Sequence, residues 1–211
     1  MISCRRYETK TLWIASTAIF GAMASVLSLL KIEIPYPVLL YLKFDLAELP
    51  SLCALLLLGP SSGAAVATVH FLFLAARAWP PGAFMKYIAV LSTLFGVWLG
   101  SKLGRSSRLI ACAALGIVCR VAAMALANLL FFTLLFPEYL EFAETLLRAG
   151  GIDCRSPLEA LLWTSVLTAL FNALHVLLDL VPSYALLRSL SRILSPRLRS
   201  SFELPPQRSG E

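Results

Sequence analysis

A short set of polar side chains lies within apolar stretches of this sequence, and these residues are the ones best placed to do chemistry. Such side chains are costly in an apolar environment, so each should bind a ligand or pair with a partner. Their types suit hydrogen bonding, ion pairing and proton transfer. His70 stands alone on its apolar stretch, where a core histidine with satisfied hydrogen bonds is the simpler interpretation and ligand contact is the alternative. The full set is His70, Arg120, Asn128, Asn172, His175 and Asp179.

Three of these residues would share one face of a helix. Asn172 and His175 are three positions apart, and Asp179 follows four positions later; these are the spacings of neighbours on a helical surface. A structural interpretation pairs Arg120 with Asp179 as an ion pair between two helices, with His175 hydrogen-bonded beside it. Ligand contact is the alternative, and it is favoured for Asn128 and Asn172, which both fall near one membrane surface.

The connection from Ile34 to Pro50 is unusually polar for a chain with such long apolar stretches. It carries charged and aromatic side chains together, namely Tyr36, Tyr41, Lys43, Phe44, Asp45 and Glu48. A connection without a function could be shorter and less polar, so this composition predicts a loop with a function at the membrane surface.

Composition indicates an integral membrane protein built from helices. The 211 residues are 59% hydrophobic and only 14% charged, with a mean hydropathy of +0.81. Soluble domains are about 45–50% apolar and about 25% charged. The apolar stretches are 11–30, 46–58, 61–78, 84–101, 108–136 and 158–187. They predict an all-α integral membrane protein, a six-transmembrane-helix bundle with a short second helix.

One hydrophobic bundle accounts for nearly the whole length. The expected divisions are a cytoplasmic N-terminal segment at 1–10, a six-helix transmembrane domain at 11–190 and a disordered cytoplasmic tail at 191–211. Gly59 and Pro60 predict a tight hairpin between the second and third helices. A short amphipathic helix is expected from Glu138 to Arg148. The first apolar stretch is long enough to cross a bilayer, so we expect it to be kept rather than cleaved as a signal peptide.

Positive charges indicate how the bundle is oriented. With six crossings both termini lie on one side of the membrane, and that side collects most of the Lys and Arg residues. They are Arg5, Arg6, Lys10, Lys102, Arg105, Arg108, Arg188, Arg192, Arg197, Arg199 and Arg208. Because cytoplasmic loops carry the excess of positive charge, both termini are predicted to be cytoplasmic. The net charge of +6 thus reflects orientation, and nucleic acid is not an expected partner.

Small residues form a stripe on the first apolar stretch. Ala18 and Ala22 are four positions apart, with Ala15, Gly21 and Ser25 nearby. Such a surface lets another helix approach closely. Two interpretations stay open, because the stripe could pack inside the bundle or dock a partner protein.

Several motifs resemble the substrate-binding (S) subunits of energy-coupling-factor (ECF) vitamin transporters, and in particular their riboflavin-binding branch. The run Leu42-Lys43-Phe44-Asp45, followed by Glu48-Leu49-Pro50 and then Gly59-Pro60, is similar to the first external loop of that family and the turn after it. The segment 82–89 resembles the start of the family's fourth helix, with Lys86 where Asn is usual. Phe171-Asn172, with His175 in place of Lys, resembles a flavin-contacting motif of the sixth helix.

The resemblance implies a binding protein of the cytoplasmic membrane that performs no catalysis and needs no cofactor. Riboflavin would be the transported ligand, held in a pocket that opens to the outside and is covered by the first loop. The expected substrate-binding residues are Tyr41, Lys43, Phe44, Asp45, Phe84, Lys86, Tyr87, Asn128, Asn172 and His175. Ala15, Ala18 and Ala22 match the surface that docks the transmembrane T subunit, and a pair of ATPase subunits completes the ECF module.

Other functions have less support in the sequence. No phosphate-binding loop motif of ATPases is present, so energy must come from separate subunits. The chain has no zinc-protease or serine-hydrolase motif, which argues against a membrane enzyme and a catalytic metal. A proton-coupled carrier with Arg120, His175 and Asp179 as a relay is an alternative, although no inverted repeat is visible. Thiamine, pantothenate or a modified base are alternative ligands for the same fold.

Overall fold

The computed structural model describes residues 2–103 and 108–193, and helices dominate them. The helices are α1 (Ile2–Leu30), α2 (Leu49–Leu58), α3 (Pro60–Ala75), α4 (Pro80–Lys102), α5 (Arg108–Leu130), α6 (Glu138–Ala149) and α7 (Pro157–Ile193). A π-helical turn, η2 (Phe131–Leu135), continues α5. Two short strands, β1 (Glu33–Pro35) and β2 (Lys43–Asp45), form an antiparallel hairpin in the first loop. The all-α prediction did not include this hairpin.

Four of the described helices are long and apolar enough to cross a membrane. These segments are Lys10–Leu30, Pro80–Lys102, Arg108–Leu135 and Pro157–Ser189. The second helix is short, as predicted, with 10 residues in α2. The predicted amphipathic helix is α6. Parts of other predictions fall outside the described residues, namely the tail from 194 to 211 and the charges Arg105, Arg197, Arg199 and Arg208.

A single residue, Gly59, makes the predicted turn between the second and third helices. Gly59 has φ of 97° and separates α2 from α3, which begins at Pro60. Glycine adopts this backbone conformation at little energetic cost. Proline suits the first position of a helix because an N–H at that position would make no hydrogen bond within the helix. The two helices then pack against each other and against α1.

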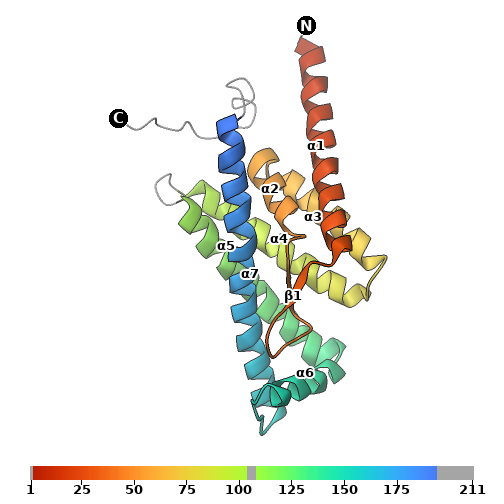
Figure 1. Cartoon of the computed structure of the whole chain (residues 1–211), viewed down its shortest axis with the longest axis vertical. Helices are drawn as coiled ribbons and strands as arrows, with labels where there is room; N and C mark the ends of the chain where they lie inside the picture. The colour runs from red at the N-terminus through yellow and green to blue at the C-terminus, as the bar shows by residue number, and fades with distance from the viewer. Residues whose placement is uncertain (1, 104–107, 194–211) are drawn as a thin grey trace.

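The two ends of the molecule are made by different elements. The N-terminal end of α1 and the C-terminal end of α7 project from one end of the molecule, and α6 lies across the opposite end (Figure 1). The long helix α7 runs past both the central bundle and α6, and it contacts α2, α5 and α6. The hairpin of the first loop lies between the two ends of the molecule (Figure 1).

Among the described residues, three apolar clusters hold these elements, and the smallest, of Ala24, Ala54 and Val66, joins α1 to α2 and α3. The central one joins α2, α3, α4, α5 and α7 through Leu52, Leu55, Ala67, Val90, Leu94, Val97, Cys112 and Leu180. The second one attaches the first loop to α6 and α7. In it, Tyr36 and Leu39 of the loop pack with Leu147 and Phe171. The loop is thus anchored by buried apolar surface as well as by polar contacts.

Glycines let α4 and α5 pack with their backbones almost touching. A Cβ added at Gly100 would lie 2.5 Å from the carbonyl oxygen of Ala111, and one added at Gly96 would overlap the carbonyl of Leu115. Gly116 faces Val97 and Val176, so α7 packs into the same region. This close approach positions Arg120, one turn beyond Gly116, against the polar centre of the bundle.

We predict that Gly100→Leu destabilises the protein, because the added side chain forces α4 and α5 apart. Overpacking of this kind costs about 1–3 kcal/mol or more. Ala122→Leu is the matched control, since Ala122 is exposed on the outer surface of α5. Thermal unfolding in detergent should show a lower midpoint for the glycine variant alone. Equal midpoints for the two variants would contradict the close packing.

Candidate ligand-binding cavity

A cavity of about 610 Å³ lies under the first loop, between α4, α5, η2, α6 and α7. One part of its wall is aromatic and is made by Tyr41, Trp79, Phe131, Phe132, Tyr139 and Phe142. The other part is polar and is made by Glu33, Lys43, Asp45, Glu48, Lys86, Arg120, Asn128, Thr168, Asn172 and His175. A cavity of this size with an apolar wall and a few converging polar groups is typical of small-molecule sites.

Arg120 of α5 organises the polar end of the cavity. Its guanidinium donates to both carboxylate oxygens of Glu48, from Nη1 to Oε2 at 2.6 Å and from Nη2 to Oε1 at 3.1 Å. Nε donates to Oδ1 of Asn172 at 2.8 Å, and Nη1 also reaches the hydroxyl of Thr93 at 3.2 Å. Arg120 and Glu48 are each only 2% exposed. The first loop, α4, α5 and α7 therefore meet at one side chain.

Glu48 ends the first loop and stands directly before α2. Its burial would by itself raise the pKa of the carboxyl group, but the Arg120 guanidinium outweighs burial and holds that pKa well below its usual range. The Glu48 side chain is consequently a carboxylate at neutral pH. A bidentate arginine–carboxylate pair fixes geometry as well as charge, so it locks the end of the loop against α5.

Two further ion pairs stabilise the first loop on the cavity wall. Asp45 on β2 pairs with Lys86 on α4, and Lys43 pairs with Glu33 across the hairpin at 2.6 Å. Strand register places Glu33 opposite Asp45 and Pro35 opposite Lys43. The two lysines near the cavity therefore already have acidic partners inside the protein.

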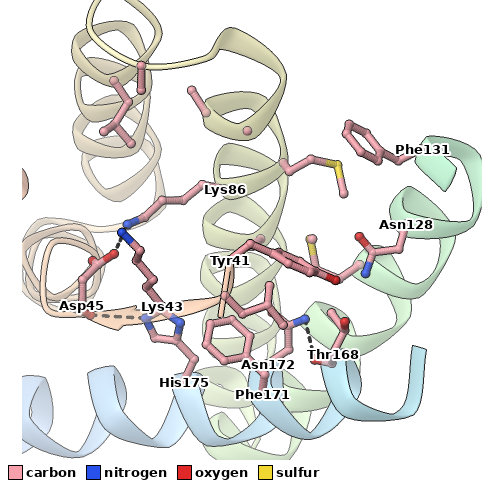
Figure 2. Close-up of a pocket in the computed structure, with 18 of the residues that line it drawn as sticks. Tyr41, Lys43, Asp45, Lys86, Asn128, Phe131, Thr168, Phe171, Asn172 and His175 are labelled. Atoms are coloured by element: carbon pink, nitrogen blue, oxygen red, sulfur yellow. Dashed lines mark hydrogen bonds and ion pairs between the residues drawn. The ribbon is translucent and has the colours of Figure 1, made fainter. Parts of the chain in front are cut away.

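His175 links the loop to α7. Its Nε2 lies 3.2 Å from the backbone carbonyl oxygen of Asp45 and 3.3 Å from Oδ2 of Asp179. Its Nδ1 lies 3.4 Å from Nη2 of Arg120. The rings of Phe44 and Phe171 pack edge-on against the imidazole. In Figure 2, a dashed line joins the imidazole of His175 to Asp45 of the hairpin.

The two predicted asparagines have different surroundings. Asn172 accepts from Arg120 and donates from Nδ2 to the backbone carbonyl of Thr168 at 2.9 Å, so its amide is largely committed to the protein. Asn128 lines the cavity from α5, and within the described part of the chain its amide makes no hydrogen bond. Figure 2 shows the ring of Tyr41 extending across the cavity toward the side where Asn128 lies. Asn128 is therefore the better-placed amide for a ligand.

Most of the predicted substrate-binding residues converge on the cavity, but three do not line it. Phe44 packs behind the wall on Tyr36 and Phe171. Phe84 is 53% exposed on the outer surface. Tyr87 stacks on Phe71 and hydrogen-bonds Thr68. The others, which do line the cavity, are Tyr41, Lys43, Asp45, Lys86, Asn128, Asn172 and His175.

The structural interpretation that paired Arg120 with Asp179 is wrong about the acidic residue. Arg120 pairs with Glu48, because the loop carries that carboxylate into the bundle, whereas Asp179 lies one turn beyond His175 and contacts the imidazole. The sequence predicts Glu48 only as a charged residue of the first loop and of its family-like motif, and no local pattern marks it as buried. His70 is buried in the core, as the simpler interpretation predicted, but its hydrogen bonds are not all satisfied, because its Nε2 has no partner within the described residues.

The alanine stripe of α1 faces away from the rest of the molecule. Ala15, Ala18 and Ala22 are all exposed, whereas Gly21 and Ala24, on the other side of α1, are buried against α3 and α2. Packing within the bundle is therefore not the role of these three alanines. They form a flat strip on the outer surface.

Comparison with known proteins identifies the class. The family model for the substrate-specific component of ECF transporters matches residues 13–184. This match covers most of the chain, so the protein belongs to the family of ECF transporter substrate-specific components. It is thus a substrate-binding component of a membrane transport system and not an enzyme.

A solved structure supports the same fold. It is described as "Structure and mechanism of the S component of a bacterial ECF transporter" and superposes on 88% of this chain and 99% of its own, with a TM-score of 0.69. The two sequences are 22% identical, so the likeness concerns the fold alone. No curated protein matches the chain.

We predict that Arg120→Met lowers the free energy of unfolding by about 3–5 kcal/mol, because it leaves the buried Glu48 carboxylate without its partner. The double variant Glu48→Leu/Arg120→Met should recover much of this loss, since neither charge then remains. Arg148→Ala, which breaks the exposed pair with Glu144, is the control and should cost at most about 1 kcal/mol. Equal losses for Arg120→Met and Arg148→Ala in detergent unfolding would contradict the role given to Arg120.

Proposed function

We propose that this protein captures riboflavin from outside the cytoplasmic membrane and delivers it inward. The observation that carries the proposal is a cavity with an aromatic wall at one end and hydrogen-bonding side chains at the other. Trp79 stacks on Tyr139, and Phe131 packs against both rings, which gives a planar ring system a rigid apolar surface. The amide of Asn128 offers a donor and an acceptor to a heteroaromatic edge or to a hydroxylated chain.

The charges around the cavity support a neutral ligand. Within the described residues, each charged side chain that lines it has an oppositely charged partner: Lys43 with Glu33, Lys86 with Asp45, and Arg120 with Glu48. A cationic ligand such as thiamine, or an anionic one such as pantothenate, would have to break one of these pairs to gain a counter-charge. Riboflavin carries no net charge, so it leaves all three pairs in place. An uncharged modified base is the main alternative ligand.

The remaining parts of the transport system follow from this role. We propose six membrane crossings with both termini in the cytoplasm, and a T subunit with a pair of ATPase subunits as partners. The exposed strip of Ala15, Ala18 and Ala22 would dock the T subunit, because small side chains allow close approach of a partner helix in the membrane. The first loop would cover the cavity after the ligand has entered.

The test of the ligand is a titration of riboflavin into the purified full chain in detergent, followed by quenching of flavin fluorescence. We expect saturable quenching, and Asn128→Leu should weaken the affinity about 10- to 100-fold, because one or two hydrogen bonds to the ligand are lost. The control is Thr133→Val, at an exposed position of η2, which should bind as the original chain does. Absence of quenching by a folded sample would overturn riboflavin, and thiamine, pantothenate and modified bases would be tested next.

The alanine strip can be tested separately from ligand binding. We expect Ala18→Leu/Ala22→Leu to abolish co-purification with the T subunit and vitamin uptake, while riboflavin binding in detergent stays unchanged. Ala125→Leu, which enlarges an exposed alanine on α5, is the matched control and should leave the complex intact. Normal uptake by the double variant would show that the partner docks elsewhere.

A further inference from the structure

The charges buried beneath the first loop do not balance. Glu48 pairs with Arg120, and Asp45 pairs with Lys86. Asp179 remains, at 1% exposure, and neither of its carboxyl oxygens has a hydrogen-bond partner within the described residues. A buried carboxylate without a compensating charge is strongly disfavoured, and such a group takes up a proton or a cation instead.

The contacts of His175 show where the missing positive charge can sit. A guanidinium has only donors, so Nδ1, which faces Nη2 of Arg120 at 3.4 Å, must act as an acceptor. The imidazole is then neutral, with its proton on Nε2. The compensating charge is therefore not on His175, and Asp179, 3.3 Å from Nε2, is the group left to carry it.

A metal ion suits this cluster less well than a proton. Glu48, His175 and Asp179 each bring a possible ligand atom within 4.8 Å of the others. However, both oxygens of Glu48 already accept hydrogen bonds from Arg120. An ion bound there would lie against the guanidinium and would be repelled by it. A proton on Asp179 needs no such space and meets no such repulsion.

We propose that Asp179 holds a proton, as a neutral carboxylic acid, while the first loop lies over the cavity. This proton keeps the first loop attached to α7. With Asp179 neutral, the N–H at Nε2 of His175 can donate to the backbone carbonyl of Asp45, which is 3.2 Å away and nearer than the Glu48 carboxylate oxygen at 3.7 Å. An ionised Asp179 would compete for the same N–H, draw it away from the loop and weaken the contact. The site is thus a proton site that controls the loop, and it does not depend on which vitamin is bound.

The groups around Asp179 are consistent with this assignment. The charged side chains around Asp179 are Glu48 at the end of the first loop, Asp45 on β2, Arg120 on α5 and Lys86 on α4. These four charges form two ion pairs, Glu48 with Arg120 and Asp45 with Lys86, so each cation among them already has a carboxylate partner other than Asp179. Its own helix contributes the neutral His175. Asp179 is therefore buried without a hydrogen bond to its carboxyl oxygens among the described residues.

Thermal unfolding as a function of pH tests the proton directly. The full chain in detergent should lose stability as pH rises, because the folded protein binds a proton that the unfolded chain releases. The unfolding midpoint should fall by roughly 3–5 °C for each pH unit over which the folded protein alone holds the proton. Asp179→Asn should show no such fall, whereas Asp153→Asn, at an exposed carboxyl outside the cluster, should behave as the original chain does.

Infrared spectroscopy of the same samples tests the protonated state without relying on a variant that folds. The original chain at neutral pH should show the carbonyl stretch of a buried carboxylic acid, and Asp179→Asn should lack it. Absence of that band from the original chain overturns the proposal, even if Asp179→Asn fails to fold. A second outcome also overturns the proposal. If sodium chloride raises the unfolding midpoint of the original chain above its value in choline chloride, and Asp179→Asn loses this difference, the compensating charge is a metal cation.

The effect on the loop is measured with a nitroxide label at Leu40→Cys, in a background whose native cysteines are replaced by alanine. Leu40 is exposed in the first loop, so a label there reports the loop's mobility. The mobile fraction of the spectrum should grow as pH rises, and it should stay constant in Asp179→Asn. If the mobile fraction does not change with pH in either protein, the proton on Asp179 does not control the first loop, and that part of the proposal is overturned.

Discussion

The structure depends above all on one buried arginine. Arg120 cannot give up its charge, so a chain that places it at 2% exposure must supply acceptors around it. They come from three different elements: Glu48 at the end of the first loop, Thr93 on α4 and Asn172 on α7. The requirement to satisfy one guanidinium thus brings together segments that are far apart in the sequence and sets the floor of the cavity.

The same interaction explains how a polar loop can lie against an apolar bundle. Glu48 enters the bundle because Arg120 compensates its charge, and the rest of the loop follows with its own partners. Lys86 on α4 holds Asp45, and the apolar side chains of Tyr36 and Leu39 pack on α6 and α7. Opposite charges are matched before a ligand arrives, so the loop can form a cover whose inner surface remains neutral. That neutrality is the basis on which we propose an uncharged ligand.

The glycines of α4 and α5 help to position Arg120, although they do not contact its polar partners. Arg120 lies one turn beyond Gly116, and the close approach at Gly96 and Gly100 determines how near α4 and α5 come to each other. With larger residues at these positions, the helices would separate, and Thr93 and Arg120 would move apart. Packing of apolar surface and satisfaction of a buried charge therefore reinforce each other, which is how a small polar centre can persist within an apolar bundle.

Much of this protein can be derived from the sequence alone. Hydropathy identifies the membrane class, the apolar segments and the amphipathic α6, and Gly59-Pro60 marks the α2–α3 hairpin, because these signals act over a few neighbouring residues. Periodicity also places Asn172, His175 and Asp179 on one face. Only the tertiary structure decides that Arg120 pairs with Glu48, 72 positions away, that Phe84 and Tyr87 point away from the cavity, and that the alanines of α1 face outward. These outcomes depend on how whole helices rotate and approach each other, which the local pattern of one segment does not specify.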